Sequence, residues 1–111
     1  LPDQDYGRNR SVFVPFFDVK ETATTTGTLI FARQPKTKTF MLIPNRHDDG
    51  SGYSVEITPA LDNFPTDNDI NDATRVNQEV EKAILRQPDQ YMWLHRRFKT
   101  RPDPDAPSVY K

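Results

Sequence analysis

Apolar residues recur every three or four positions between residues 70 and 87, which is the spacing of one face of an α-helix. The polar segment before them supplies an N-cap, Asp69 or Asn71. Glu79 and Lys82 are three residues apart and are spaced to pair on the outer surface. The sequence therefore predicts an amphipathic helix over 70–87, with Ile70, Ala73, Val76, Val80, Ala83, Ile84 and Gln87 on one face.

Two stretches before this helix predict a β-hairpin. Residues 37–46 form a strand that ends at Pro44, and residues 53–61 alternate apolar and polar side chains. The segment HDDGSG between them is typical of a turn. We expect the second strand to be half-buried, with its core face formed by Tyr53, Val55 and Ile57.

The first third of the chain is less regular. Residues 11–19 are rich in β-branched and aromatic residues, but Pro15 cannot donate to a ladder, so an edge or broken strand is expected. Residues 22–34 fit either structure: the threonines favour a strand, whereas Leu29, Ile30 and Arg33 fit a helical face. We predict a helix from about Thr24 to Gln34.

Pro88 is well placed to begin a second helix. Its inner face would carry Tyr91, Leu94, His95 and Phe98. Residues 103–111 contain two prolines after Pro102 and predict an extended tail, so the folded domain is expected to span 1–102.

Composition narrows the class of protein. A chain of 111 residues forms at most one domain, and with 34% apolar residues it has no run long enough to span a bilayer. The absence of cysteine excludes disulfides and thiol chemistry. Residues 1–90 hold 10 Lys and Arg against 14 Asp and Glu, whereas residues 91–111 hold 5 against 2. The pI of about 6.1 makes a nucleic-acid-binding domain, usually above about pI 9, less favoured.

The basic end carries the first candidate site. Trp93 lies just before four cations, Arg96, Arg97, Lys99 and Arg101, which we call the basic cluster. In a helix these cations would point largely outward. The cluster is then either the wet face of a packed terminal helix or a binding surface for phosphate groups or an anionic bilayer.

The second candidate is the opening loop. In an extended segment Asp3 and Asp5 point the same way, with Gln4 opposite. The loop is either a solvated acidic turn or part of a reaction centre, where Arg8 and Arg10 could meet phosphate or the carboxylates.

Neither histidine carries a catalytic or metal-binding pattern. No Ser or Cys nucleophile motif accompanies His47 or His95, and neither has an acidic residue five positions later. His47 is interpreted as a turn residue, and no metal site is predicted.

Residues 77–102, NQEVEKAILRQPDQYMWLHRRFKTRP, resemble the C-terminal signature of the lipid A secondary acyltransferases, the lauroyl and myristoyl transferases of Kdo-lipid A. The segments PDQDYG, SVFVPFF, ATTTGT and GSGYSVEITPALDNFPT are also similar to that family, so the resemblance covers essentially the whole chain. It implies an α/β fold: the C-terminal part of a glycerolipid-acyltransferase-like domain, with mixed strands and covering helices.

The resemblance also implies a function. The family transfers a fatty acyl chain from acyl carrier protein to a lipid A precursor, without a cofactor, at the cytoplasmic face of the bacterial inner membrane. Its catalytic His and the acidic residue five positions later lie upstream of PDQD, as does its membrane anchor. We therefore expect no catalytic residue in this chain and no activity from it alone.

The resemblance assigns substrate-binding roles to Asp3, Gln4, Asp5, Arg8, Arg10 and the basic cluster. The cluster would contact the phosphates or acid sugars of the lipid, the anionic membrane surface or the carrier protein, and His95 would be structural. An anionic-polymer-binding module and a purely structural terminal domain are the alternatives. We also expect exposed apolar surface around Phe13, Phe16 and Phe17, which would favour self-association.

Overall fold

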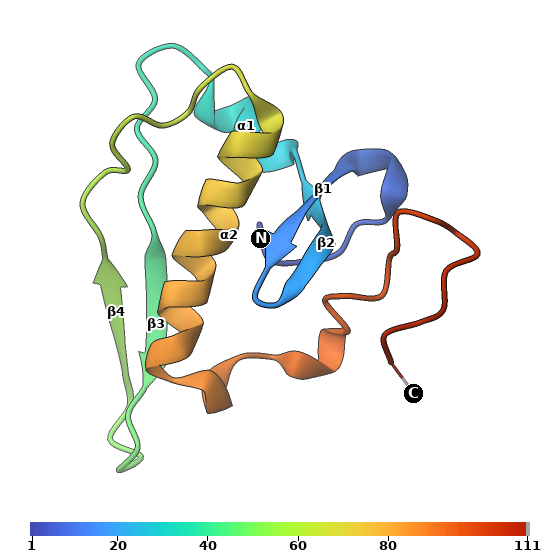
Figure 1. Ribbon diagram of the computed structural model, residues 1–111. Helices are drawn as coiled ribbons and strands as arrows, with labels where there is room; N and C mark the ends of the chain where they lie inside the picture. Colours follow the sequence, from blue (N-terminus) through green and yellow to red (C-terminus); the bar gives the residue numbers. More distant parts are fainter. Residues whose placement is uncertain (111) are drawn as a thin grey trace.

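The amphipathic segment forms the longest helix, α2 (Asp69–Arg86), and the other elements surround it in a computed structural model that describes residues 1–110. One β-hairpin lies on each side of α2 (Figure 1). The N-cap is Asn68 rather than Asp69 or Asn71, and its side-chain oxygen accepts from the Asn71 backbone N–H at 3.0 Å. The predicted Glu79–Lys82 pair is confirmed, with Nζ and Oε1 3.1 Å apart.

The first hairpin pairs β1 (Ser11–Phe16) with β2 (Val19–Thr25) in antiparallel register. The register shifts between Val14 and Phe16, where Pro15 lacks the N–H that a regular ladder needs. The predicted helix from Thr24 was wrong at its start, because Thr24 and Thr25 belong to β2 and only α1 (Gly27–Ala32) is helical. The β-branched threonines favour the extended backbone, as the alternative interpretation held.

The second hairpin pairs β3 (Leu42–Arg46) with β4 (Tyr53–Ile57), which confirms the predicted hairpin. β3 continues through Pro44, since a strand with a single neighbour can turn the residue that lacks an N–H outward. The predicted burial of β4 was wrong. Tyr53, Val55 and Ile57 are 75%, 56% and 65% exposed, because no element within residues 1–110 covers that face of the hairpin.

The core forms where α2 meets β1 and α1. Its buried members are Phe16, Leu29, Val76, Val80 and Ile84. The expected apolar surface around Phe13, Phe16 and Phe17 is therefore absent from residues 1–110: Phe16 is fully buried and the other two are half-buried. Two hairpins and one main helix make a small α/β structure in which all described strand pairs are antiparallel. No helix within residues 1–110 has the length and apolar character to cross a bilayer.

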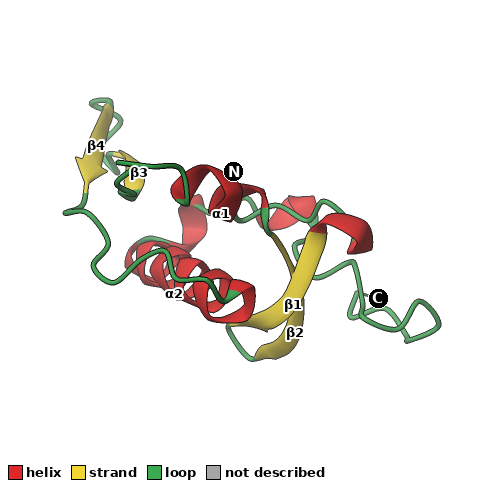
Figure 2. Cartoon of the chain, turned by 90° about the horizontal axis from the view of Figure 1, so that it is seen from above, coloured by secondary structure: helices red, strands yellow, loops and turns green. Residues whose placement is uncertain are grey.

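The predicted second helix after Pro88 was also wrong. Only two 3-10 turns form, η2 (Pro88–Gln90) and η3 (Trp93–His95), and Arg96 then adopts the left-handed conformation with φ 55°. Leu94 is 92% exposed instead of facing the core, although Tyr91 and Phe98 do pack against it. Seen from above, this C-terminal segment runs away from α2 along the side of the β1–β2 hairpin (Figure 2).

A buried chain of hydrogen bonds connects these elements. The Asn77 amide of α2 donates to the Pro15 carbonyl and to the Thr24 hydroxyl, both at 2.9 Å. The Thr24 hydroxyl donates in turn to the Thr22 carbonyl at 3.1 Å. Because these groups are shielded from water, each bond that is lost leaves an unpaired polar atom inside the protein.

Replacing Asn77 with Ala should therefore lower the free energy of unfolding by about 1–3 kcal/mol. The matched control is Gln78→Ala, at the exposed next position of α2, which should change stability by less than about 0.5 kcal/mol. Urea unfolding, monitored by circular dichroism, measures the free energy of unfolding of both variants. Equal midpoints for the two variants would show that the Asn77 bonds add nothing.

A second buried polar group fixes the start of α2. The Asp72 carboxylate is 2% exposed and accepts from the Thr66 N–H, the Thr66 hydroxyl and the Arg33 guanidinium. Burial is the largest single influence on the pKa of Asp72 and raises it, but the hydrogen bonds from Arg33 and Thr66 together outweigh burial, so the pKa lies below its ordinary value.

A pKa that folding lowers gives stability above the unfolded-state value, about 3.9 for Asp, and this stability is lost as the pH falls through the folded value. Asp72→Asn should accordingly be less stable than the unaltered chain at pH 7. The difference should shrink as the pH falls below about 4. Urea midpoints from pH 7 to pH 3 test this, with Asp67→Asn in the same loop as control. A constant difference at every pH would rule out the carboxylate charge as the cause.

Candidate functional site

The two ends of the chain meet, and Asp5 makes the contact. Its carboxylate accepts from the Thr100 backbone N–H at 2.9 Å, from the Thr100 hydroxyl at 2.8 Å and from the Gly7 N–H at 2.9 Å. Gly7 has φ 83°, a left-handed conformation that glycine adopts without strain. Asp5 thus holds the opening loop against the C-terminal segment, with both carboxylate oxygens already engaged.

Arg8 strengthens the same junction. Its guanidinium donates to the backbone carbonyls of Arg101, at 2.7 Å, and Pro102, at 3.2 Å. Arg10 is exposed and has no side-chain hydrogen bond within residues 1–110. The two arginines that sequence reasoning grouped together are therefore in different states, one joined to the backbone and one free in solvent.

Arg97 is the principal correction to the predicted basic cluster. It was expected to point outward, but it is 1% exposed. Its guanidinium donates to the Ala23 carbonyl and to the Thr24 hydroxyl, and lies 5.1 Å from the centre of the Phe16 ring. Since the backbone turns at Arg96 and is not helical, consecutive side chains leave it on different sides, and Arg97 faces the interior.

The buried position changes the electrostatics of Arg97. Burial lowers the pKa of Arg97 below the usual arginine range, and the nearby groups Tyr91, Asp5 and Asp3 oppose the shift only partly. Burial also raises the pKa of Tyr91, with a further contribution from the Asp3 charge. The opening loop thus places its carboxylates where they partly offset a buried cation.

The other members of the basic cluster are more accessible. Arg96 and Lys99 are exposed, and the Arg96 guanidinium lies 5.3 Å from the centre of the Tyr110 ring. Arg101 is half-buried. Tyr110 itself comes from the predicted tail, and its hydroxyl accepts from the Phe98 N–H at 2.9 Å. The domain boundary at residue 102 stays a prediction.

Asp3 and Gln4 lie beside the aromatic part of the C-terminal segment. The Asp3 carbonyl accepts from the His95 ring at 3.1 Å and from the Tyr91 hydroxyl at 3.4 Å, and the Asp3 carboxylate lies close enough to Tyr91 to raise its pKa. Gln4 accepts from the Tyr6 hydroxyl at 3.2 Å. Through its ring, His95 connects the opening loop to the C-terminal segment, and its structural role stays a prediction.

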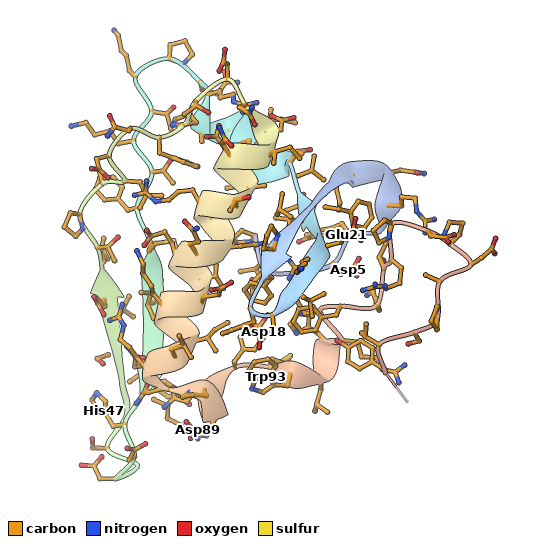
Figure 3. The ribbon with its side chains drawn as sticks, in the orientation of Figure 1. Asp5, Asp18, Glu21, His47, Asp89 and Trp93 are labelled. Atoms are coloured by element: carbon orange, nitrogen blue, oxygen red, sulfur yellow. The ribbon has the colours of Figure 1, made fainter. Side chains whose placement is uncertain are left out.

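Trp93 and His47 have separate surroundings. The Trp93 indole donates to the Pro88 carbonyl at 2.9 Å and is 47% exposed, with one side packed near Tyr91 and Phe17. His47 lies at the tip of the β3–β4 hairpin, far from Asp5 and beside Ser51 (Figure 3). No cluster of residues suited to hold a metal ion occurs within the described part of the chain.

Sequence reasoning missed a pocket of about 430 Å³ between α2 and the β3 segment. Its walls include Met41, Ile43, Val80, Ala83 and Ile84, and Asp3 also lines it. The helical wall was visible in the sequence as part of the apolar face of 70–87. The facing wall was not, because nothing in the local pattern shows which element packs opposite that face.

Comparisons with known proteins give these residues a context. The family model of the bacterial lipid A biosynthesis acyltransferases matches residues 1–100, which include both ends of the junction around Asp5. The chain belongs to this family. The resemblance seen in the sequence is thereby confirmed.

The relatives are close in sequence but longer. A lipid A biosynthesis acyltransferase of Haemophilus influenzae is 48% identical over 98% of this chain and 35% of its own length. The lipid A biosynthesis lauroyltransferase of Escherichia coli is 48% identical over the same shares. The palmitoleoyltransferase of Escherichia coli is 48% identical over 91% of this chain and 33% of its own length. The chain thus spans about a third of these acyltransferases, and no solved structure matches it significantly.

The split of the basic cluster into buried and exposed members can be measured. Arg97→Ala should lower the free energy of unfolding by about 2–4 kcal/mol, since it leaves a void and removes the donors to Ala23 and Thr24. Arg97→Lys should recover only part of this, because an ammonium group lacks the planar fork of donors. Lys99→Ala should change stability by less than about 0.5 kcal/mol. Similar urea midpoints for Arg97→Ala and Lys99→Ala would contradict the buried position.

Proposed function

We propose that the protein that contains this chain transfers a fatty acyl group to a lipid A precursor in lipopolysaccharide biosynthesis. The observation that carries the proposal is the family match over residues 1–100, together with 48% identity to acyltransferases of that pathway. The names of two such relatives specify different acyl groups, lauroyl and palmitoleoyl, at the same 48% identity. Overall identity therefore does not select the chain length.

The finer assignments rest on the resemblance. The donor is acyl carrier protein, and the reaction takes place at the cytoplasmic face of the inner membrane. The chain supplies substrate-binding groups, while the His and acid that catalyse transfer lie outside it, so the chain alone is inactive. Exposed cations support this assignment, because the carrier protein, the lipid phosphates and an anionic bilayer all attract positive charge.

The structure suggests how these binding groups divide. Asp5, Arg8 and Arg97 are engaged in internal hydrogen bonds, so they maintain the shape of the site. Side chains available to a substrate are the exposed cations Arg10, Arg96 and Lys99, whereas Asp3 is half-buried. Arg101, half-buried, and Gln4, bonded to Tyr6, are intermediate cases. An anionic-polymer-binding module with a basic C-terminal helix gains less support, since that helix does not form and Arg97, one of its cations, is buried.

The test uses the full product of the gene in membranes, with acyl carrier protein charged with a fatty acyl group as donor and a lipid A precursor as acceptor. The variant replaces Arg96 and Lys99 with Ala, and the matched control replaces Lys36 and Lys38, two exposed cations remote from the junction. We assume that each exposed cation contributes about 1 kcal/mol to binding an anionic partner. The KM for the donor or for the acceptor should then rise roughly tenfold to thirtyfold in the variant, with kcat nearly unchanged. The control should retain the original KM.

The outcomes separate the parts of the proposal. Absence of transfer by the unaltered protein with every acyl donor would reject the acyltransferase function. Transfer with the same KM in the variant and in the unaltered protein would keep the function but remove Arg96 and Lys99 from substrate or membrane binding.

A further inference from the structure

The pocket between α2 and β3 has a defined end. The Gln90 side chain accepts from the Arg46 N–H and donates to the Arg46 carbonyl, both at 2.8 Å. In this way a glutamine amide takes the place of a neighbouring strand and ties the C-terminal segment to the end of β3. This pair holds the wall in place, and both the oxygen and the nitrogen of the Gln90 amide take part in it.

The lining of the pocket selects the chemistry of a ligand. Aliphatic side chains dominate it, including Met41, Ile43, Val80 and Ile84, and no Lys, Arg or His side chain lines it within residues 1–110. A phosphate, a carboxylate or a sugar would lose hydration there without gaining an ionic partner. A volume of about 430 Å³ falls within the range of roughly 300–1,000 Å³ that is typical of small-molecule sites.

A few polar groups interrupt this apolar lining. The Gln87 side-chain oxygen is buried and has no hydrogen-bond partner within residues 1–110. The half-buried side chain of Asp3 also lines the pocket and is its one acidic residue in the described part of the chain. A long apolar ligand with a polar group along or at the end of its chain matches this combination better than a pure hydrocarbon does.

We propose that this pocket binds the aliphatic chain of the fatty acyl group, and that the small side chain of Ala83 sets how long a chain it accepts. Ala83 lies one helical turn from Val80 and from Gln87 on the pocket side of α2. A larger residue there would fill the space between the helix and β3. The inference rests on the proposed acyltransferase function for the identity of the ligand, but the pocket itself is tested separately.

The first experiment measures binding by the full product of the gene. Displacement of the fluorescent fatty acid cis-parinaric acid by saturated fatty acids of increasing length gives the affinity of each. Affinity should rise about fourfold per methylene while the added carbon is still buried, and then level off. Ala83→Leu should move the plateau to shorter chains and weaken the longest ones at least tenfold. Gln78→Leu places the same side chain on an exposed part of α2 and should change nothing.

The second experiment measures transfer by the full gene product with acyl carrier protein donors of different chain length. Ala83→Leu should shift the preferred donor toward shorter chains and retain transfer of short ones. Ile43→Ala enlarges the opposite wall and should shift the preference toward longer chains. If circular dichroism shows that Ala83→Leu is misfolded, the Ile43→Ala variant still tests the proposal.

The results distinguish the pocket from the function. Unchanged binding and unchanged donor preference in folded variants would overturn the pocket assignment while leaving the acyltransferase function intact. Shifted fatty-acid binding, with no transfer by the unaltered gene product from any donor, would reject the function and support an aliphatic-chain pocket. Failure of the unaltered gene product to bind cis-parinaric acid, together with no change in donor preference, would also overturn the assignment.

Discussion

Arg97 places a guanidinium in the interior of a small protein, and the hydroxyl of Thr24 and the carbonyl of Ala23 receive it there. Thr24 also accepts from Asn77, so one hydroxyl on β2 joins the main helix, the first hairpin and the C-terminal segment. A buried charge without partners is strongly unfavourable, and this hydrogen-bonding arrangement therefore fixes the path of the chain on both sides of Arg97. The Phe16 ring beneath the guanidinium adds a cation–π contact from the apolar core.

This constraint explains why the two ends of the chain form one surface. Once Arg97 is held against β2, Thr100 lies where Asp5 can accept two hydrogen bonds from it, and the carbonyls of Arg101 and Pro102 lie where Arg8 can reach them. Residues that the sequence marks as binding groups thus include several that build the junction. Loss of function after their replacement would mix lost contacts with lost structure, which is why the exposed and buried cations have to be varied separately.

Local patterns predicted the elements whose conformation depends on local physics. The helix over α2 follows from its apolar spacing and a polar cap, and the β3–β4 hairpin follows from alternation and a turn. The same patterns failed where contacts with distant parts of the chain determine the conformation. Thr24 and Thr25 became strand because β1 pairs with them, and residues after Pro88 lost their helix because Gln90, Tyr91 and Arg97 bond to distant backbone or pack against it. The prediction that Tyr53 is buried failed for a related reason. Alternation of apolar and polar residues shows that a strand has two different faces, but it does not show which element covers either face.

The basic cluster of the candidate site also shows that a local sequence pattern does not determine which side chains are exposed. Four cations in six residues predict a positive surface only if their side chains leave the backbone together, and that holds for neither an extended nor a turning chain. The left-handed turn at Arg96 sends Arg97 inward and leaves Lys99 in solvent, so the charge that reaches a partner is smaller than the charge in the sequence. The buried part of that charge stabilises the junction, and the exposed part is free to bind anionic groups. A basic run in a sequence therefore gives an upper bound on a binding surface, and the backbone path determines how much of it remains.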